Sequence, residues 1–377
     1  MNILIALDSF KGSLSAAQAC EVVAQALASA LPGHGRHCIP MADGGEGTAA
    51  ALVAACRGQF VTLAQVSGPL PGQRVTARYG WLPESATAIV EMAEASGLPL
   101  VPADRRDPRW TTTRGTGEML AHALARGAAR IALTLGGSAT HDGGTGAARA
   151  LGWRFLDRAG RDLPEGGAAL GRLARIVPPV QPLPTVAVEA LCDVTNPLCG
   201  PSGAAAVYGP QKGATPALVQ ELDAALLTLA DRLRADLGVD VASLPGAGAA
   251  GGFGAGAVAF LGARLVRGVD AVAEVNGLTA GTSAADWILT GEGRFDSQSL
   301  QGKVVSGVLC RALAAGKPVA VLAGSVALDR QAWQEAGVSD VEACTPAGMS
   351  LEEAMRRAPE LLDAATCRLA RRRLQAQ

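Results

Sequence analysis

The sequence contains few aromatic residues and no excess of either charge. Phe, Trp and Tyr together make up 3% of the 377 residues, whereas hydrophobic residues as a class reach 49%. Glycine, alanine and aliphatic side chains must therefore build the core, which favours close packing of helices and strands. Lys and Arg number 33 against 34 Asp and Glu. Because nucleic-acid binding needs a basic surface, this balance argues against it.

Signals for membranes and secretion are missing as well. No apolar run reaches the length of a membrane span, and the N-terminal segment has neither the basic region nor the cleavage site of a signal peptide. The eight cysteines are scattered without C-x-x-C spacing. In a chain without a secretory signal, this predicts reduced thiols rather than disulfides or a zinc site. We expect a soluble, cytoplasmic protein with no membrane or nucleic-acid partner.

The common nucleotide-binding motifs are absent or misplaced. The sequence contains no G-x-x-x-x-G-K-[ST] phosphate loop and no H-R-D and D-F-G pair. Gly246, Gly248 and Gly251 match the G-x-G-x-x-G fingerprint, but a loop precedes them where that fingerprint needs a strand. Nicotinamide binding is therefore disfavoured, and a phosphotransferase would need another scaffold.

The hydrophobic pattern predicts an α/β fold. Both ends of the chain alternate strands and helices. The strands are expected at 2–7, 36–41, 286–289, 319–323 and 341–343, and the helices at 15–31, 300–315 and from 350 onward. In the middle, strands at 59–66, 74–81 and 88–92 predict an antiparallel arrangement.

This order is explained by a discontinuous open-sheet domain that is interrupted by a second domain. We place the first domain at 1–65 and 285–377. The inserted α/β domain then covers 66–284.

Two segments rich in glycine and charge follow predicted strands in the first domain, where open α/β sheets bind ligands. They are DSFKGS (8–13) and ADGGEGT (42–48). In the first, Lys11 and the neighbouring amides predict an anion site at a helix N-terminus. In the second, Asp43 and Glu46 flank glycines that let the main chain approach a ligand. These acids are candidates to hold a metal ion or to accept a substrate hydroxyl.

Three further segments have the same character. TLGGSATHDGGTGAA (134–148) predicts a phosphate cradle of main-chain amides with Ser138 and Thr140. CDVTNPLCGPSGAAAVYGPQKGA (192–214) carries Asp193, Asn196 and Lys212, an order that suits a general base or Mg²⁺ together with a cation for phosphate. LTGEGRFDSQSLQGK (289–303) leaves a strand with two acids, an arginine and a lysine, which predicts a phosphate site.

The five segments together, in this order, resemble the bacterial glycerate kinases of the first type, and the resemblance spans almost the whole chain. It implies two α/β domains, one of them Rossmann- or flavodoxin-like and the other inserted into it. It also implies transfer of the γ-phosphoryl group of ATP to D-glycerate with Mg²⁺, chiefly giving 2-phosphoglycerate. His141 departs from the family, in which we expect asparagine at this place.

The segments and the resemblance together define the expected site. The catalytic residues are expected to be Asp193, Lys11, Asp43 and Lys212. Substrate and nucleotide binding is assigned to Ser9, Lys11, Gly44, Gly45, Glu46, Gly137, Ser138, Thr140, Asn196, Glu292, Arg294, Asp296 and Lys303. Asp193 and Asp296 are the metal candidates, and Asp193 is expected nearest the reacting hydroxyl.

Two other functions stay open at this point. A non-catalytic binder of organic phosphates would use the same loops, although it gains nothing from acids in its pocket. A nicotinamide-dependent hydroxyacid dehydrogenase is weakened by the misplaced fingerprint. We expect a monomer or a homodimer.

Overall fold

The computed structural model describes residues 1–45, 47–300 and 303–374. Its internal contacts divide the chain into two compact units. Unit 1 comprises Met1–Asp43, Ala50–Arg57 and Arg267–Gln377, and unit 2 comprises Gly44–Ala49 and Gly58–Val266. Unit 1 is therefore discontinuous in sequence. The contacts divide the chain at 57/58 and 266/267, whereas the sequence boundaries were placed at 65/66 and 284/285.

Unit 1 is built on a five-stranded sheet that joins both ends of the chain. Its order is β13-β12-β11-β1-β2, and every pair of neighbours is parallel. The strands are β1 (Asn2–Leu7), β2 (Gly35–Cys38), β11 (Trp287–Phe295), β12 (Val319–Val326) and β13 (Asp340–Ala343). This parallel sheet confirms the α/β class predicted from the alternation of strands and helices.

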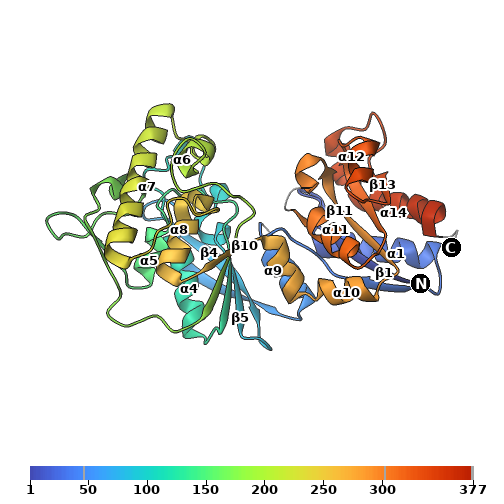
Figure 1. The fold of residues 1–377 in the computed structure, drawn as a ribbon, viewed down its shortest axis with the longest axis horizontal. Coiled ribbons are helices and arrows are strands. Elements are labelled where there is room, and N and C mark those ends of the chain that lie inside the picture. The colour runs from blue at the N-terminus through green and yellow to red at the C-terminus, as the bar shows by residue number, and fades with distance from the viewer. Residues whose placement is uncertain (46, 301–302, 375–377) are drawn as a thin grey trace. The chain divides into compact units, whose positions relative to one another are not determined.

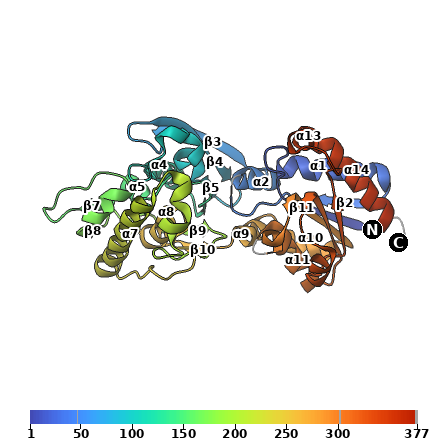
Figure 2. The ribbon, with the colours of Figure 1, turned by 90° about the horizontal axis from the view of Figure 1, so that it is seen from above.

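Helices cover both faces of this sheet, as the buried strands require. Ile3, Ile5 and Leu7 share a core with α1 (Ala16–Ala30) and α14 (Ala358–Leu369), which lie side by side (Figure 2). The other face carries α10 (Leu278–Ala284) and α11 (Val304–Ala314), and α9 (Gly268–Val275) packs against these two helices. A capping box between Ser15 and Gln18 is present at the start of α1.

Two predictions about local structure in unit 1 were wrong. The strand predicted at 286–289 continues to Phe295, because Glu292 and Arg294 pair with β12 instead of forming a turn. Gly291, just before Glu292, allows close strand contact, since a side chain there would meet the carbonyl oxygen of Leu322. The single C-terminal helix is divided into α13 (Leu351–Arg356) and α14, with Pro359 in the first turn of α14.

Unit 2 contains a six-stranded mixed sheet in the order β10-β9-β6-β5-β4-β3. The strands are β3 (Gln59–Ser67), β4 (Arg74–Leu82), β5 (Thr87–Glu91), β6 (Arg130–Thr134), β9 (Ala187–Leu191) and β10 (Arg264–Val266). The predicted antiparallel arrangement holds for β3, β4 and β5, and the remaining neighbours are parallel.

The helices of unit 2 pack on this sheet and on a small hairpin (Figure 1). They are α2 (Thr48–Ala55, shared with unit 1), α3 (Ala93–Ser96), α4 (Arg114–Ala125), α5 (Thr145–Ala150), α6 (Ala204–Tyr208), α7 (Pro216–Leu237) and α8 (Ala249–Leu261). The hairpin pairs β7 (Arg154–Leu156) with β8 (Arg175–Val177). Among the described residues, no helix is both long and apolar enough to cross a bilayer.

The tract that matches the G-x-G-x-x-G fingerprint has a different role here. Turns precede it instead of a strand. Ala250, Gly251 and Gly252 have φ angles of 54°, 66° and 89°, so the chain passes through three left-handed residues at the start of α8. A side chain at Gly251 would meet the carbonyl oxygen of Thr140. The glycines therefore allow close packing on the loop after β6.

Candidate active site

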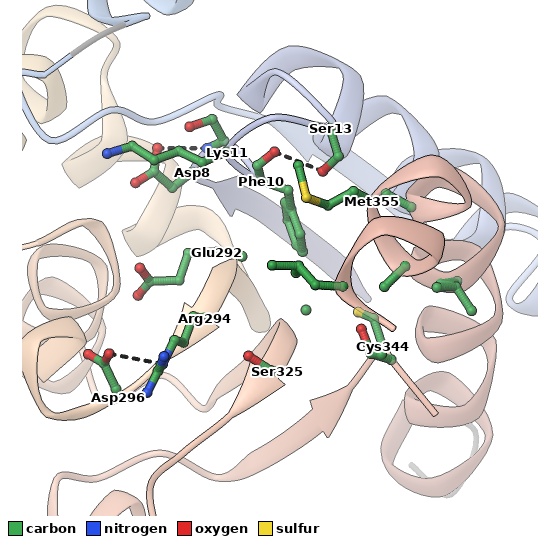
Figure 3. A pocket seen from close by; sticks show the side chains of 18 of the residues that line it. Asp8, Phe10, Lys11, Ser13, Glu292, Arg294, Asp296, Ser325, Cys344 and Met355 are labelled. Atoms are coloured by element: carbon green, nitrogen blue, oxygen red, sulfur yellow. Dashed lines mark hydrogen bonds and ion pairs between the residues drawn. The ribbon is translucent and has the colours of Figure 1, made fainter. Parts of the chain in front are cut away.

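A cavity of about 740 Å³ opens in unit 1 at the carboxyl ends of β1 and β11. This edge of a parallel sheet is where open α/β proteins bind ligands. Figure 3 shows charged side chains on one side of the cavity, Met355 and Cys344 on the other, and Phe10 between them. The predicted site residues that line it are Ser9, Lys11, Asp43, Glu292, Arg294, Asp296 and Lys303.

The loop between β1 and α1 holds Lys11 at the rim of this cavity. The main chains of Phe10 and Leu14 donate hydrogen bonds to each other's carbonyl groups at 2.9 and 3.0 Å, which closes a tight loop. Gly12 has a φ of +77°, and the methyl group of Met355 occupies the space that a side chain there would need. The positive φ therefore favours glycine at this turn. The loop leaves the Lys11 side chain exposed to solvent.

Carboxylates gather beside Lys11. Asp8 follows β1 and accepts a hydrogen bond from the amide of Ser9 at 2.6 Å. Burial and the nearby charges of Asp43 and Glu292 raise the pKa of Asp8 to about 7, with Lys11 opposing the shift. Burial also raises the pKa of Glu292. Its Oε1 is buried without a hydrogen-bond partner among the described residues.

Cations meet these acids at the same edge. Arg294 forms an ion pair with Asp296, with 3.4 Å between Nε and Oδ2. Both side chains keep solvent access, so this pair contributes little to stability and is available to a ligand. Lys303 precedes the first turn of α11 and is half-buried. The charged side of the cavity thus combines carboxylate oxygens with three basic side chains.

Three other predicted site residues, Lys212, Ser138 and Thr140, form a buried cluster in unit 2. Lys212 is only 2% exposed, and its ammonium group donates to Ser138 Oγ at 2.8 Å and to the carbonyl oxygen of Thr140 at 2.7 Å. Gly137 turns the same loop with a φ of +71° and accepts a hydrogen bond from Leu98. Burial lowers the pKa of Lys212 to about 7.

Asp142 and His141 complete this cluster. The Asp142 carboxylate accepts hydrogen bonds from the amide and hydroxyl of Thr113 and from the amides of Gly144 and Gly146. Burial raises its pKa, and these four donors oppose the shift. Burial and the charge of Lys212 lower the pKa of His141 to about 3. Both ring nitrogens of His141 are buried without partners among the described residues.

Asp193 and Asn196 lie on the loop after β9. Asp193 is exposed to solvent. Asn196 accepts a hydrogen bond from the Tyr208 hydroxyl at 2.6 Å and donates one to the carbonyl oxygen of Ser202 at 2.8 Å. These contacts tie the loop to the start and end of α6. Asn196 therefore holds this loop in place, in addition to the binding role that the sequence predicts.

The predicted segment 42–48 is shared by the two units. Asp43 belongs to unit 1, whereas Gly44 and Gly45 belong to unit 2, and Glu46 lies outside the described residues. Gly45 accepts a hydrogen bond from the Thr48 hydroxyl at 2.8 Å. The start of α2 is also bound by a buried acid that the sequence analysis did not select, Glu91, which accepts from the amide of Ala49 at 2.6 Å.

The sequence analysis missed two parts of the cavity. Asp8 stands first after β1 within the segment DSFKGS, so its position offered a signal that was not used. The apolar side comes from residues 344–361, where methionine, leucine and alanine have the spacing of ordinary helix residues. No local pattern distinguishes such residues from core residues.

The parallel sheet and the charged cavity at its carboxyl edge define a protein that binds and transforms small anionic molecules. Comparison with known proteins identifies the family. A sequence model of the glycerate kinase family matches residues 3–374, and the chain belongs to this family.

The relatives match over nearly their whole length. The chain is 45% identical to a glycerate kinase of Halalkalibacterium halodurans over 371 residues, which cover 98% of this chain and 97% of the relative. It is 43% identical to the glycerate 2-kinase of Escherichia coli over 358 residues, covering 94% and 93%. A crystal structure from Salmonella typhimurium LT2, provisionally described as glycerate kinase 2, matches with a TM-score of 0.89 and 43% identity. That match covers 100% of this chain and 98% of the other.

Proposed function

We infer that the chain is a glycerate kinase, which transfers the γ-phosphoryl group of ATP to a hydroxyl of D-glycerate and favours 2-phosphoglycerate as product. The family match over residues 3–374 carries this conclusion, and the relative named glycerate 2-kinase supports the choice of product. The cavity in unit 1 suits the chemistry, because phosphoryl transfer depends on positioning and on neutralising charge.

The carboxylate oxygens of the cavity are suitable ligands for a Mg²⁺ ion that enters together with a nucleotide. Among the described residues, no group of three His, Cys, Asp or Glu side chains forms a metal cage. Mg²⁺ in such enzymes is held by one or two carboxylates and by substrate phosphates. The orphaned oxygen of Glu292 and the crowded carboxylate of Asp8 offer such ligands. When bound, the ion would neutralise phosphate charge.

We propose Asp8 and Glu292 as these ligands, with the sequence candidates Asp193 and Asp296 as alternatives. The basic side chains of the cavity, Lys11, Arg294 and Lys303, would bind phosphate or carboxylate groups. The buried Lys212 would act differently, because its ammonium group already holds the loop that carries Ser138 and Thr140. For Lys212 we propose a positioning role.

Asp193 remains our proposed base for the substrate hydroxyl. It is exposed two residues after β9, on a loop that Asn196 and Tyr208 hold in place. A base in such a place is rigidly supported and accessible to substrate.

A coupled assay tests this function. The protein is incubated with D-glycerate, ATP and Mg²⁺, ADP release is followed continuously, and the product is identified by phosphorus NMR. We expect ADP and 2-phosphoglycerate in equal amounts and no turnover without a divalent cation. Reduction of a nicotinamide by glycerate would support the dehydrogenase instead. ATP binding without any turnover would support the non-catalytic binder.

We also propose that the enzyme works in the cytoplasm as a monomer or a homodimer. All eight cysteines are free thiols, which suits a reducing compartment. Light scattering of the purified protein would distinguish the two oligomeric states.

A further inference from the structure

The cavity in unit 1 has more room and a different chemistry than glycerate alone requires. Its volume of about 740 Å³ lies within the range of sites for drug-sized ligands. Glycerate has three carbons, and each carries oxygen, so it has no apolar face to bury. Yet the side of the cavity opposite the charged groups, where Met355 and Cys344 lie, carries several apolar side chains (Figure 3). A ligand with an apolar part would match that side.

The apolar side, which we call the helical wall, consists of Met349, Leu351, Ala354, Met355 and Leu361. Leu351 is 76% exposed, so its side chain is accessible to a ligand at the rim of the cavity. Phe10 forms the boundary with the charged side and is itself only 5% exposed. Methionine side chains are flexible and polarisable, so they adapt to flat ring systems.

The helical wall and the charged side line one continuous cavity, and residues of the two sides pack against each other. Met355 packs against Gly12 in the loop that presents Lys11. Ser350 caps α13 by accepting a hydrogen bond from the amide of Glu353 at 3.2 Å, which fixes the helix that carries the wall. A ligand with an apolar ring at one end and several negative charges at the other would match both sides.

We propose that the helical wall receives the base of the nucleoside triphosphate, while its phosphates lie toward Lys11, Arg294 and Lys303. This inference rests on the proposed kinase function, because that reaction requires a nucleotide donor. It assigns a binding role to Leu351 and Met355, which the sequence analysis did not select. It also places the donor's base within unit 1.

Equilibrium binding tests the proposal without relying on turnover. Titration calorimetry would measure the affinities of ATP and of inorganic tripolyphosphate, both at the same Mg²⁺ concentration, for the full-length protein. The variants are Leu351→Ser and Met355→Gln, which remove apolar contact without adding charge. Leu227→Ser is the matched control, since Leu227 is a 51% exposed helical leucine of α7, outside this cavity.

We expect both wall variants to weaken ATP binding about fivefold to tenfold, as the loss of part of a buried apolar contact predicts. Tripolyphosphate has no base, so its affinity should stay unchanged in all variants. The control should bind ATP like the wild type. Unchanged ATP affinity in both wall variants would overturn the proposal. An equal loss for ATP and tripolyphosphate would overturn it too, because the wall would then only support the Lys11 loop.

Failure of this inference can be told apart from failure of the proposed function. If the wild type phosphorylates glycerate but the wall variants bind ATP normally, the kinase stands and the base lies elsewhere. If the wall variants show the selective loss of ATP affinity but the wild type never phosphorylates glycerate, the nucleotide site stands and the kinase assignment falls.

Discussion

Lys11 and Lys212 occupy similar sequence contexts but opposite environments. Each follows polar or aromatic residues and precedes a glycine in a loop that was expected to bind phosphate. Lys11 is exposed at the rim of an open cavity, whereas Lys212 is 2% exposed and donates hydrogen bonds to Ser138 and Thr140. A glycine-flanked lysine therefore marks a constrained loop, and only tertiary packing decides whether its charge reaches a ligand.

The acids beside the two lysines differ in the same way. Asp8 lies near other carboxylates in the cavity of unit 1, and burial and their repulsion raise its pKa to about 7. Asp142 in unit 2 is surrounded by four hydrogen-bond donors from Thr113, Gly144 and Gly146. A bound cation would reduce the repulsion between the carboxylates around Asp8. The Asp142 carboxylate already has its hydrogen-bond donors and needs no cation. The comparison teaches that uncompensated charge, more than charge itself, distinguishes the cavity that we propose as the binding site.

The largest expected effect separates Asp193 from Asp8. Asp193→Asn keeps the size of the side chain and removes its charge, so kcat should fall at least ~100-fold, the lower end for a positioned general base. Because Asp193 is exposed, the thermal midpoint should hardly change. Steady-state kinetics and a thermal melt measure both. Near-full kcat in Asp193→Asn would contradict the role of Asp193 as base, whereas loss of kcat in Asp8→Asn is expected from its proposed role as a Mg²⁺ ligand.

The second prediction concerns the stability of unit 2 at alkaline pH. Burial lowers the pKa of Lys212 to about 7 in the folded protein, from the ordinary lysine value of 10.5 that applies to the unfolded chain. Between these values the unfolded chain binds one more proton than the folded one, so the free energy of unfolding should rise with pH from about 7 to about 10.5. The slope from one such group is at most about 1.4 kcal/mol per pH unit.

Lys212→Met should lose this part of the pH dependence, because methionine does not titrate. Thermal melts of both proteins at several pH values between 7 and 10 provide the measurement. The quantity to compare is the change of the midpoint with pH, which separates titration from any loss of hydrogen bonds at Ser138. If the midpoint changes equally with pH in the wild type and the variant, Lys212 stays charged when buried.

Asp8 should give the opposite sign in unit 1 and a smaller effect, because it is only partly buried. Its pKa is raised from 3.8 to about 7, so between these values the folded protein holds a proton that the unfolded chain has lost. Its contribution to the free energy of unfolding therefore falls as pH rises from about 4 to about 7. Asp8→Asn should remove that decline in melts across this range. An unchanged decline would place Asp8 in a more solvated environment than the structure gives it.

Local patterns were enough to predict much of the fold. The strand at Asn2–Leu7 and the capped helix at Ala16–Ala30 have periodicity and capping residues that act within a few positions. The extension of β11 through Glu292 and Arg294 was missed because it depends on pairing with β12, a strand over twenty residues away. Pairing partners are not visible in a local pattern.

The candidate site was predictable to a similar degree. The chain has only four lysines, and three of them, Lys11, Lys212 and Lys303, stand in the glycine-rich segments. Their identity could be predicted, but the burial of Lys212 could not, because it depends on packing of a distant loop. The helical wall had no sequence signal either, since its methionines and leucines resemble core residues. Only the fold shows that they face a cavity.

The smallest expected effect concerns His141 in the buried cluster of unit 2. Its pKa of about 3 keeps the imidazole neutral near pH 7, so one ring nitrogen is a donor and the other an acceptor. Neither has a partner among the described residues, and each unsatisfied buried polar group costs free energy. His141→Leu should therefore raise the free energy of unfolding by about 1 kcal/mol, or the midpoint by roughly 2–4 °C for a domain of this size.

His141→Gln keeps a polar group of similar size and is the matched control, which should show no such gain. If leucine lowers the midpoint while glutamine preserves it, the position needs a hydrogen-bonding group. The distinction between the cavity of unit 1, with unsatisfied charge, and the buried cluster of unit 2, with satisfied polar groups, would then not apply to His141.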